Sequence, residues 1–139
     1  MNVEKLTSAE KALLEAARDA QSRAYAPYSK FPVGAAVLDE SGRVHSGCNV
    51  ENAAYPMGDC AETGAIAAMV LAGGRRIQSL LVMGDGKGLV TPCGGCRQKL
   101  REFASADTPV LVANRKGLRA RFTLGQLLPE SFGPENLKS

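Results

Sequence analysis

Apolar side chains recur at helical spacing near the start of the chain. Behind Thr7-Ser8-Ala9-Glu10, which has the spacing of a capping box, they occupy Leu13, Leu14, Ala17 and Ala20. This pattern predicts a first helix from about Ser8 to Ala24. Pro27 follows closely, and because the residue before a proline is biased away from helical geometry, the segment from Tyr25 to Ser29 is predicted to be a loop.

Short apolar runs that lack helical spacing predict five strands. Val33 to Asp39 and Arg43 to Asn49 flank the turn residues Ser41-Gly42, so these two strands are expected to pair as a hairpin. The other three are predicted further along, at Ile77 to Met83, Pro109 to Ala113 and Arg119 to Phe122. A turn at residues 114–117 joins the last two.

Two further apolar stretches have the composition of helices. Cys60 to Ala72 is rich in Ala, Met, Ile and Leu, lacks proline and runs into Gly73-Gly74, which provides a C-terminal stop. Asp59 is the expected N-cap, which places Cys60 at the first helical position. The other helix is predicted from Gly94 or Gly95 to Phe103, and a short one from Thr123 to Leu128.

The resulting order is helix, two strands, helix, strand, helix, two strands, short helix. Helices that alternate with the later strands favour a sheet covered on both faces. The sequence therefore predicts an α/β fold with three α/β/α layers around a mixed five-stranded sheet. The chain has 139 residues and no repeat, linker or low-complexity segment, so residues 1–139 are expected to form one domain.

Composition narrows the class of protein. With 45% hydrophobic and 22% charged residues, the chain resembles a globular domain. The net charge of +3 is spread along the chain, and 5% aromatic residues with no Trp do not predict a basic groove that stacks nucleic acid bases. The longest apolar run, residues 65–72, is far shorter than the ~20 residues of a membrane span. The N-terminus lacks the apolar core of a signal peptide, so we expect a cytoplasmic protein without nucleic acid or membrane partners.

Four cysteines in a reducing compartment favour metal binding or catalysis over disulfides. Cys93 and Cys96 form a C-x-x-C pair, whose spacing lets two thiolates bind one Zn²⁺, and Cys60 supplies a third sulfur. Three ligands leave one tetrahedral position open, which distinguishes a catalytic zinc from a structural one. Glu62 is poorly placed for a fourth ligand, because it lies two residues from Cys60 on a predicted helix. It is better suited to act as a general base.

A structural zinc site is the alternative interpretation, with His45 or Cys48 as its fourth ligand. These two residues lie three positions apart on a predicted strand, so their side chains point to opposite faces and at most one can face the metal. A structural zinc also leaves Glu62 and residues 49–52 without a role. The glycine-rich segment at residues 84–88 lacks the spacing of a phosphate-binding Walker loop.

The C-x-E and P-C-x-x-C patterns resemble those of the zinc nucleoside and nucleobase deaminases, in the variant with three cysteine ligands. The similarity to the short, homotetrameric cytidine deaminases extends over nearly the whole chain. It rests on the segments Tyr25-Ala26-Pro27-Tyr28-Ser29-Lys30-Phe31-Pro32-Val33-Gly34-Ala35-Ala36, Gly47-Cys48-Asn49-Val50-Glu51-Asn52-Ala53, Cys60-Ala61-Glu62, Pro92-Cys93-Gly94-Gly95-Cys96-Arg97-Gln98, Leu127-Leu128-Pro129 and Phe132-Gly133-Pro134.

This resemblance implies a cytidine deaminase-like fold and a hydrolase that acts on the cyclic amidine C–N bond of cytidine and 2′-deoxycytidine. The products are uridine or deoxyuridine and ammonia, in pyrimidine salvage. It implies one Zn²⁺ per chain, held by Cys60, Cys93 and Cys96, with zinc supplying an activated water and Glu62 shuttling protons.

The same resemblance implies how the substrate is bound. Phe31 stacks on the ring, Asn49 and Glu51 hydrogen-bond the ribose, and Ala61 belongs to the substrate-binding residues. Polar groups committed to a sugar reject a ligand that lacks it, which favours a free nucleoside over a free base or a polynucleotide. Two further substrate-binding positions, Tyr55 and Phe132, match residues that reach the site from neighbouring subunits in the family.

Two positions depart from the family pattern. Thr63 stands where Arg is common, and Ala54 where Ser is usual. Zinc with three thiolates carries a net charge of −1, which the family Arg offsets, whereas Thr63 brings no charge. The sequence offers two sources of positive charge that can offset this −1, the helix N-termini and Arg97. Arg97 can equally fasten its own helix region. These departures leave open a deaminase of another cytosine-bearing compound, such as blasticidin S, or a catalytically silent zinc-binding protein. A polynucleotide deaminase is disfavoured by the lack of a basic stacking groove.

Overall fold

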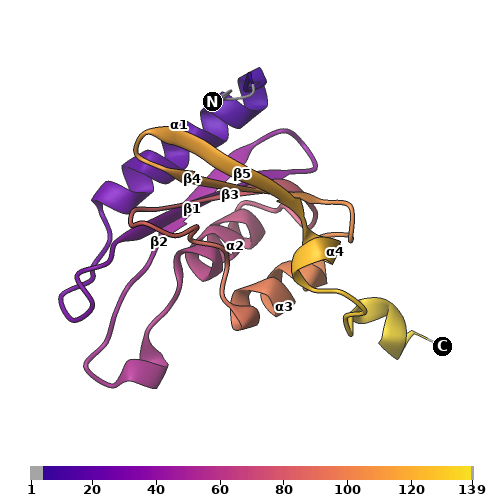
Figure 1. Cartoon of the computed structure of the whole chain (residues 1–139). Helices are drawn as coiled ribbons and strands as arrows, with labels where there is room; N and C mark the ends of the chain where they lie inside the picture. Colours follow the sequence, from indigo (N-terminus) through magenta and orange to yellow (C-terminus); the bar gives the residue numbers. More distant parts are fainter. Residues whose placement is uncertain (1–4, 139) are drawn as a thin grey trace.

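A five-stranded sheet lies at the centre of the computed structural model, which describes residues 5–138 (Figure 1). Its strand order is β2-β1-β3-β4-β5. The strands are β1 (Val33–Asp39), β2 (Val44–Cys48), β3 (Ile77–Gly84), β4 (Pro109–Asn114) and β5 (Gly117–Thr123). Only β3 and β4 pair in parallel, and the other neighbours are antiparallel. A parallel pair requires a crossover connection, and α3 (Gly94–Phe103) lies within it.

Helices cover both faces of this sheet. Figure 1 shows α1 (Ser8–Ser22) on one side, and α2 (Ala61–Leu71) together with α3 on the other. Side chains alternate between faces along a strand, so Ala36 of β1 packs with Leu13 of α1 while Ala35 and Val37 pack with α2. β1 and β3 are thus buried on both faces, which explains their continuous apolar sequences. The predicted three-layer α/β/α fold with a mixed five-stranded sheet is confirmed.

Most predicted elements are present, with shifted ends. The Thr7–Glu10 capping box is formed, but α1 ends at Ser22 and not at Ala24, because the chain from Tyr25 pairs with Val50. The first predicted strand has the observed bounds of β1, and the predicted hairpin with β2 is formed. Two 3₁₀ turns, η1 (Tyr55–Met57) and η2 (Pro134–Leu137), were not predicted. α4 (Leu124–Leu127) is the predicted short helix.

The predicted N-cap of α2 is wrong. Cys60, with φ −76° and ψ 160°, is the N-cap, and the helix begins at Ala61. Asp59 instead exchanges two backbone hydrogen bonds of 2.9 Å with Val50, so tertiary pairing holds it in an extended segment. The correction moves the Cys60 thiol from the helix to the point where the chain enters it.

Close packing against the sheet seats α2. A Cβ atom at Gly47 of β2 would lie 2.4 Å from the backbone N of Ala65 and 2.6 Å from the carbonyl oxygen of Ala61. Only a glycine permits this approach of strand and helix. The sheet therefore positions the N-terminal half of α2 directly. Within residues 5–138, no helix combines the length and the apolar character that crossing a membrane requires.

Candidate active site

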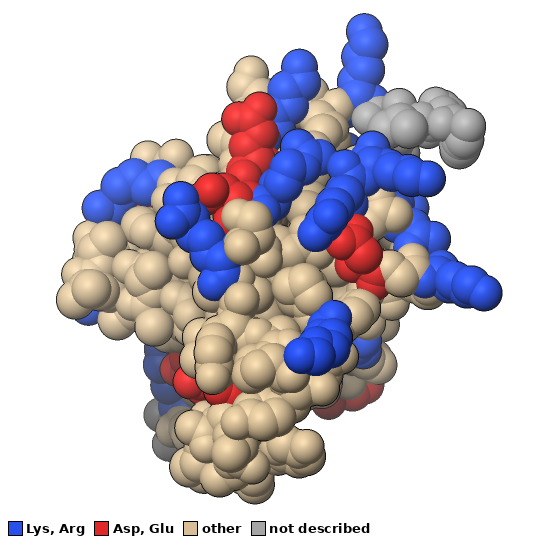
Figure 2. All heavy atoms as spheres, turned by 90° about the vertical axis from the view of Figure 1, so that its left-hand side faces the viewer, with Lys and Arg blue, Asp and Glu red and all other residues tan. Residues whose placement is uncertain are grey.

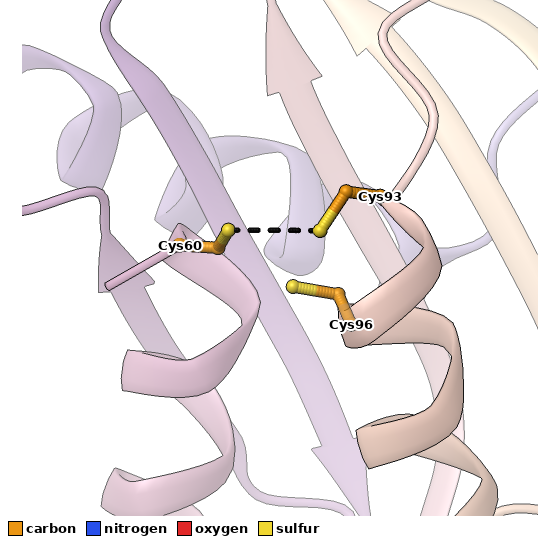
Figure 3. A group of neighbouring side chains, drawn as sticks. All are labelled: Cys60, Cys93 and Cys96. Carbon is orange, nitrogen blue, oxygen red and sulfur yellow. Dashed lines mark hydrogen bonds between the residues drawn. The ribbon is translucent and has the colours of Figure 1, made fainter. Parts of the chain in front are cut away.

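Three cysteine thiols converge where α2 and α3 begin (Figure 3). Cys60 and Cys93 are the N-caps of these helices, and Cys96 lies in the first turn of α3. The three sulfurs lie within 4.8 Å of one another, with 3.7 Å between those of Cys60 and Cys93. Sulfurs at two corners of a tetrahedron around Zn²⁺, each about 2.3 Å from the metal, are ~3.8 Å apart. The geometry of the three thiols therefore fits one zinc ion.

The local electrostatics of these thiols differ. Burial raises the pKa of Cys96 and of Cys60 above the ordinary thiol value. Burial acts in the same direction on Cys93, but hydrogen bonds from the Cys96 backbone N–H and from the neighbouring thiols lower its pKa overall. Both helices direct their positive N-terminal ends at the cluster, which favours thiolates. Deprotonation of Cys60 and Cys96 is thus coupled to metal binding.

Glu62 lies beside the cysteine cluster and is 3% exposed. The thiol of Cys96 donates to its Oε1 at 3.6 Å. Burial raises the pKa of the Glu62 carboxyl, and the charge of Lys99 opposes part of that rise. A carboxyl with a raised pKa can exchange protons closer to neutral pH than an ordinary glutamate. Glu62 therefore has the position and environment of a general acid–base next to a metal.

A cavity of about 160 Å³ adjoins these groups. Its lining includes two of the cysteines and Glu62, and consists of Val33, Asn49, Cys60, Ala61, Glu62, Val82, Val90, Thr91 and Cys93. This volume is below the ~300–1,000 Å³ typical of sites that enclose a drug-sized ligand. It has room for a single small ring.

Asn49 and Glu51 are both engaged in hydrogen bonds with the loop that carries Phe31. The Asn49 amide accepts from the N–H of Val33 at 2.8 Å and donates to the carbonyl of Phe31 at 3.0 Å. The Glu51 carboxylate accepts from the N–H groups of Tyr28 and Ser29 and from the Ser29 hydroxyl, which lowers its pKa. These two side chains thus fasten the loop to the segment that follows β2.

The predicted substrate residues are distributed over two cavities. Asn49 and Ala61 line the cavity at the cysteines, whereas Glu51 and Tyr55 line a second one of about 330 Å³, formed by Tyr28, Ser29, Glu51, Asn52, Tyr55 and Gly58. Phe31 is 39% exposed and lies against Gly86, where an added Cβ would be 3.7 Å from its ring. Phe132 lines neither cavity, and its carbonyl accepts from Gln98 at 2.9 Å.

Arg97 contacts oxygen atoms. Its guanidinium donates to the carbonyls of Pro92 and Leu127, at 2.7 and 2.8 Å, and to the Thr91 hydroxyl at 3.0 Å. The sequence left two roles open for Arg97: to support a thiolate or to fasten the region around its own helix. These contacts favour the second role.

Thr63 has a partner that sequence reasoning misses. Its Oγ1 accepts from the ammonium of Lys99 at 3.0 Å. The signal for Lys99 in the sequence is its position three residues after Cys96, which places both side chains on one face of α3.

The alternative zinc ligands lie elsewhere. His45 hydrogen-bonds to the buried carboxylate of Asp39 at 2.7 Å, and the Cys48 thiol is 3.8 Å from the carbonyl of Arg23. Within the described part of the chain, neither belongs to the group of side chains able to share a metal with Cys60, Cys93 and Cys96. The interpretation as a closed structural site is therefore wrong for these two residues.

Comparisons with known proteins agree with this geometry. A model of the cytidine and deoxycytidylate deaminase zinc-binding region matches residues 7–112, which contain the three cysteines and Glu62. A cytidine deaminase of Sporosarcina psychrophila is 45% identical over 137 residues, covering 99% of this chain and 96% of that protein. One from Mycobacterium tuberculosis is 44% identical over 122 residues, or 87% of each chain. The crystal structure of a Burkholderia pseudomallei cytidine deaminase superposes with a TM-score of 0.82 at 41% identity, covering 91% of this chain and 100% of that one.

Proposed function

This chain belongs to the cytidine and deoxycytidylate deaminase family, and we propose that it hydrolyses cytidine and 2′-deoxycytidine to uridine or deoxyuridine and ammonia. The observation that carries this proposal is the buried Glu62 beside three converging thiols. We infer that the reaction belongs to pyrimidine salvage in the cytoplasm.

In this mechanism Cys60, Cys93 and Cys96 would hold a zinc ion. When bound, zinc lowers the pKa of a water molecule from 15.7 to about 7 and so makes a nucleophile available near neutral pH. Glu62 would accept a proton from the attacking water and deliver it to N3 of the base while the C4–O bond forms. It then takes the second proton of the water to the leaving amine as the C4–N4 bond breaks. The raised pKa of Glu62 supports both transfers, because a carboxyl that protonates easily can act as base and as acid.

The base occupies the small cavity that Asn49 and Ala61 line, and the sugar lies toward Glu51. An ionised carboxylate offers about four acceptor positions, and three donors already bond to Glu51. One position is therefore left for a ribose hydroxyl. The Asn49 amide likewise has donor capacity beyond its bond to the Phe31 carbonyl. Phe31 borders the ring from the loop that both side chains secure.

The site is completed in a homotetramer, with Tyr55 and Phe132 supplied by neighbouring subunits. These side chains are 75% and 58% exposed. Other large apolar side chains are exposed in the loop before β1 and in the segment between β2 and α2, namely Tyr25, Tyr28, Val50 and Met57. Figure 2 shows Lys and Arg gathered on the upper part of one face and few charges on the lower part, where Figure 1 places η1. A sparsely charged, apolar surface supports association between copies of the chain.

The proposal is tested by following the loss of cytidine absorbance in the ultraviolet and the release of ammonia. Wild type is compared with Glu62→Ala and with Glu15→Gln, which alters an exposed carboxylate on α1 across the sheet. We expect wild type and Glu15→Gln to convert cytidine, and Glu62→Ala to retain one zinc per chain without turnover.

A panel of deoxycytidine, cytosine, 5-methylcytidine and blasticidin S extends the assay. Turnover of blasticidin S without cytidine would refute the sugar assignment and leave the metal chemistry in place. Zinc binding without turnover of any compound would instead identify a silent zinc protein.

A further inference from the structure

A hydrogen bond joins α2 and α3 one turn beyond the cysteine cluster. Thr63 follows Cys60 by three residues, and Lys99 follows Cys96 by three residues. The Lys99 ammonium donates to Thr63 Oγ1 at 3.0 Å, so a cation bridges the two helices that begin at the cysteine cluster. Thr63 is half-buried, and no part of Lys99 lines the cavity at the cysteines.

The site needs such a cation. Three thiolates on one Zn²⁺ carry a net charge of −1, and the ionised Glu62 adds another negative charge. Concentrated negative charge in a partly buried site is costly unless it is paired. The two helix N-termini each provide the equivalent of about +0.5 charge, which leaves part of the total uncompensated.

Three basic side chains follow Cys96 on α3, and they have different partners. Arg101, the furthest along the helix, is paired with Glu135 at 2.9 Å. The guanidinium of Arg97 is directed at Pro92, Leu127 and Thr91, all through oxygen atoms. Lys99 is held by Thr63 within the first turn of α2, one residue after Glu62 and three after Cys60. The geometry of these contacts makes Lys99 the better candidate for charge compensation.

We propose that Lys99 is a positioning residue that offsets the negative charge of the cysteine centre and Glu62, with Thr63 holding its ammonium in place. The role in turnover rests on the proposed function, whereas the role in metal retention does not. Zinc binding converts thiols into a centre of charge −1, and a cation nearby favours that bound state. Lys99 is exposed, so solvent screens its charge, and such a charge changes an equilibrium by about twofold to fivefold.

The test separates charge from mere bridging of the helices. Lys99→Met removes the positive charge, and Lys99→Arg keeps it. The double variant Thr63→Arg with Lys99→Met places the positive charge on α2 and lacks the Lys–Thr hydrogen bond. Lys11→Met, an exposed change on α1, controls for the net charge of the protein. Each variant is measured for kcat and KM with cytidine and for the rate at which a chelator removes zinc.

We expect Lys99→Met to lower kcat by about twofold to fivefold with little change in KM, and to release zinc faster by a similar factor. Lys99→Arg and the double variant should recover both properties, while Lys11→Met resembles wild type. Wild-type values for Lys99→Met, or failure of the relocated charge to restore them, would overturn the proposal. If wild type turns over no cytosine nucleoside, the proposed function fails, and the zinc-release rates alone decide the role of Lys99.

Discussion

Replacing Gly47 with alanine tests how strictly the sheet positions the active-site helix. The added Cβ would lie 2.4 Å from the Ala65 backbone N, whereas ordinary contacts of this kind begin near 3.4 Å. The difference means that β2 and α2 must separate by about 1 Å. Because the obstructing atoms belong to the backbone, no side-chain rotation relieves the clash.

The cost of this separation affects both stability and activity. Overpacking typically costs about 1–3 kcal/mol, and a backbone clash places Gly47→Ala at the upper end of that range. For a domain of this size, about 3 kcal/mol lowers Tm by roughly 10 °C. The start of α2 carries Cys60 and Glu62, and a displacement of ~1 Å at reacting groups costs about a hundredfold in rate.

Thermal unfolding followed by circular dichroism measures the first effect, and cytidine turnover with zinc content measures the second. Gly88→Ala is the matched control, since a Cβ there meets nothing within 4 Å. We expect the control to stay within about 0.5 kcal/mol of wild type. A Gly47→Ala protein with wild-type Tm and turnover would show that the contact between β2 and α2 does not position the site.

Three further predictions concern pH, packing and metal. Hydrogen bonds from Arg121 lower the pKa of Glu10 from 4.5 to about 2, so its ionised form stabilises the fold above pH 4.5. In urea titrations, the difference in free energy of unfolding between wild type and Glu10→Gln should therefore shrink as the pH falls toward 2. A difference that stays constant with pH would contradict this. Leu100→Ala in the core should lower the free energy of unfolding by about 2–5 kcal/mol in the same titrations. Leu71 is 90% exposed, so Leu71→Ala should lower it by ~0.5 kcal/mol or less, and equal losses would refute the packing argument. Removing zinc with a chelator should abolish turnover and leave the far-ultraviolet circular dichroism unchanged, because the two core clusters contain none of the three cysteines. Unfolding on chelation would contradict this.

Elements with a local cause could be predicted from sequence. The α1 cap lies in two side chains three residues apart, Thr7 and Glu10, and the apolar run at Val33–Asp39 reports a strand buried on both faces. The N-cap of α2 could not be predicted in this way. Asp59 has the better intrinsic capping propensity, but its backbone pairs with Val50, nine residues away, and Cys60 takes the cap position.

The same division applies to the candidate site. The three cysteines and Glu62 were recognisable because metal binding demands particular residue types at particular spacings. Lys99 was missed: its spacing from Cys96 places it on the cysteine side of α3, but its contact with Thr63, 36 residues away, depends on the packing of the two helices. The proposed sugar contacts of Asn49 and Glu51 stay predictions, and the structure adds that both side chains also secure the loop carrying Phe31.

The sequence by itself determined the layered α/β fold, and it identified the candidate metal ligands and the candidate proton-transferring carboxylate, since spacing and side-chain chemistry specify each of them. Only the tertiary structure decided which atoms surround these groups. It directs Arg97 to carbonyl oxygens, brings Lys99 to Thr63 and seats α2 on Gly47. The physical reason is that charge compensation and close packing depend on distances between segments remote in sequence, which the packing of helices on the sheet sets.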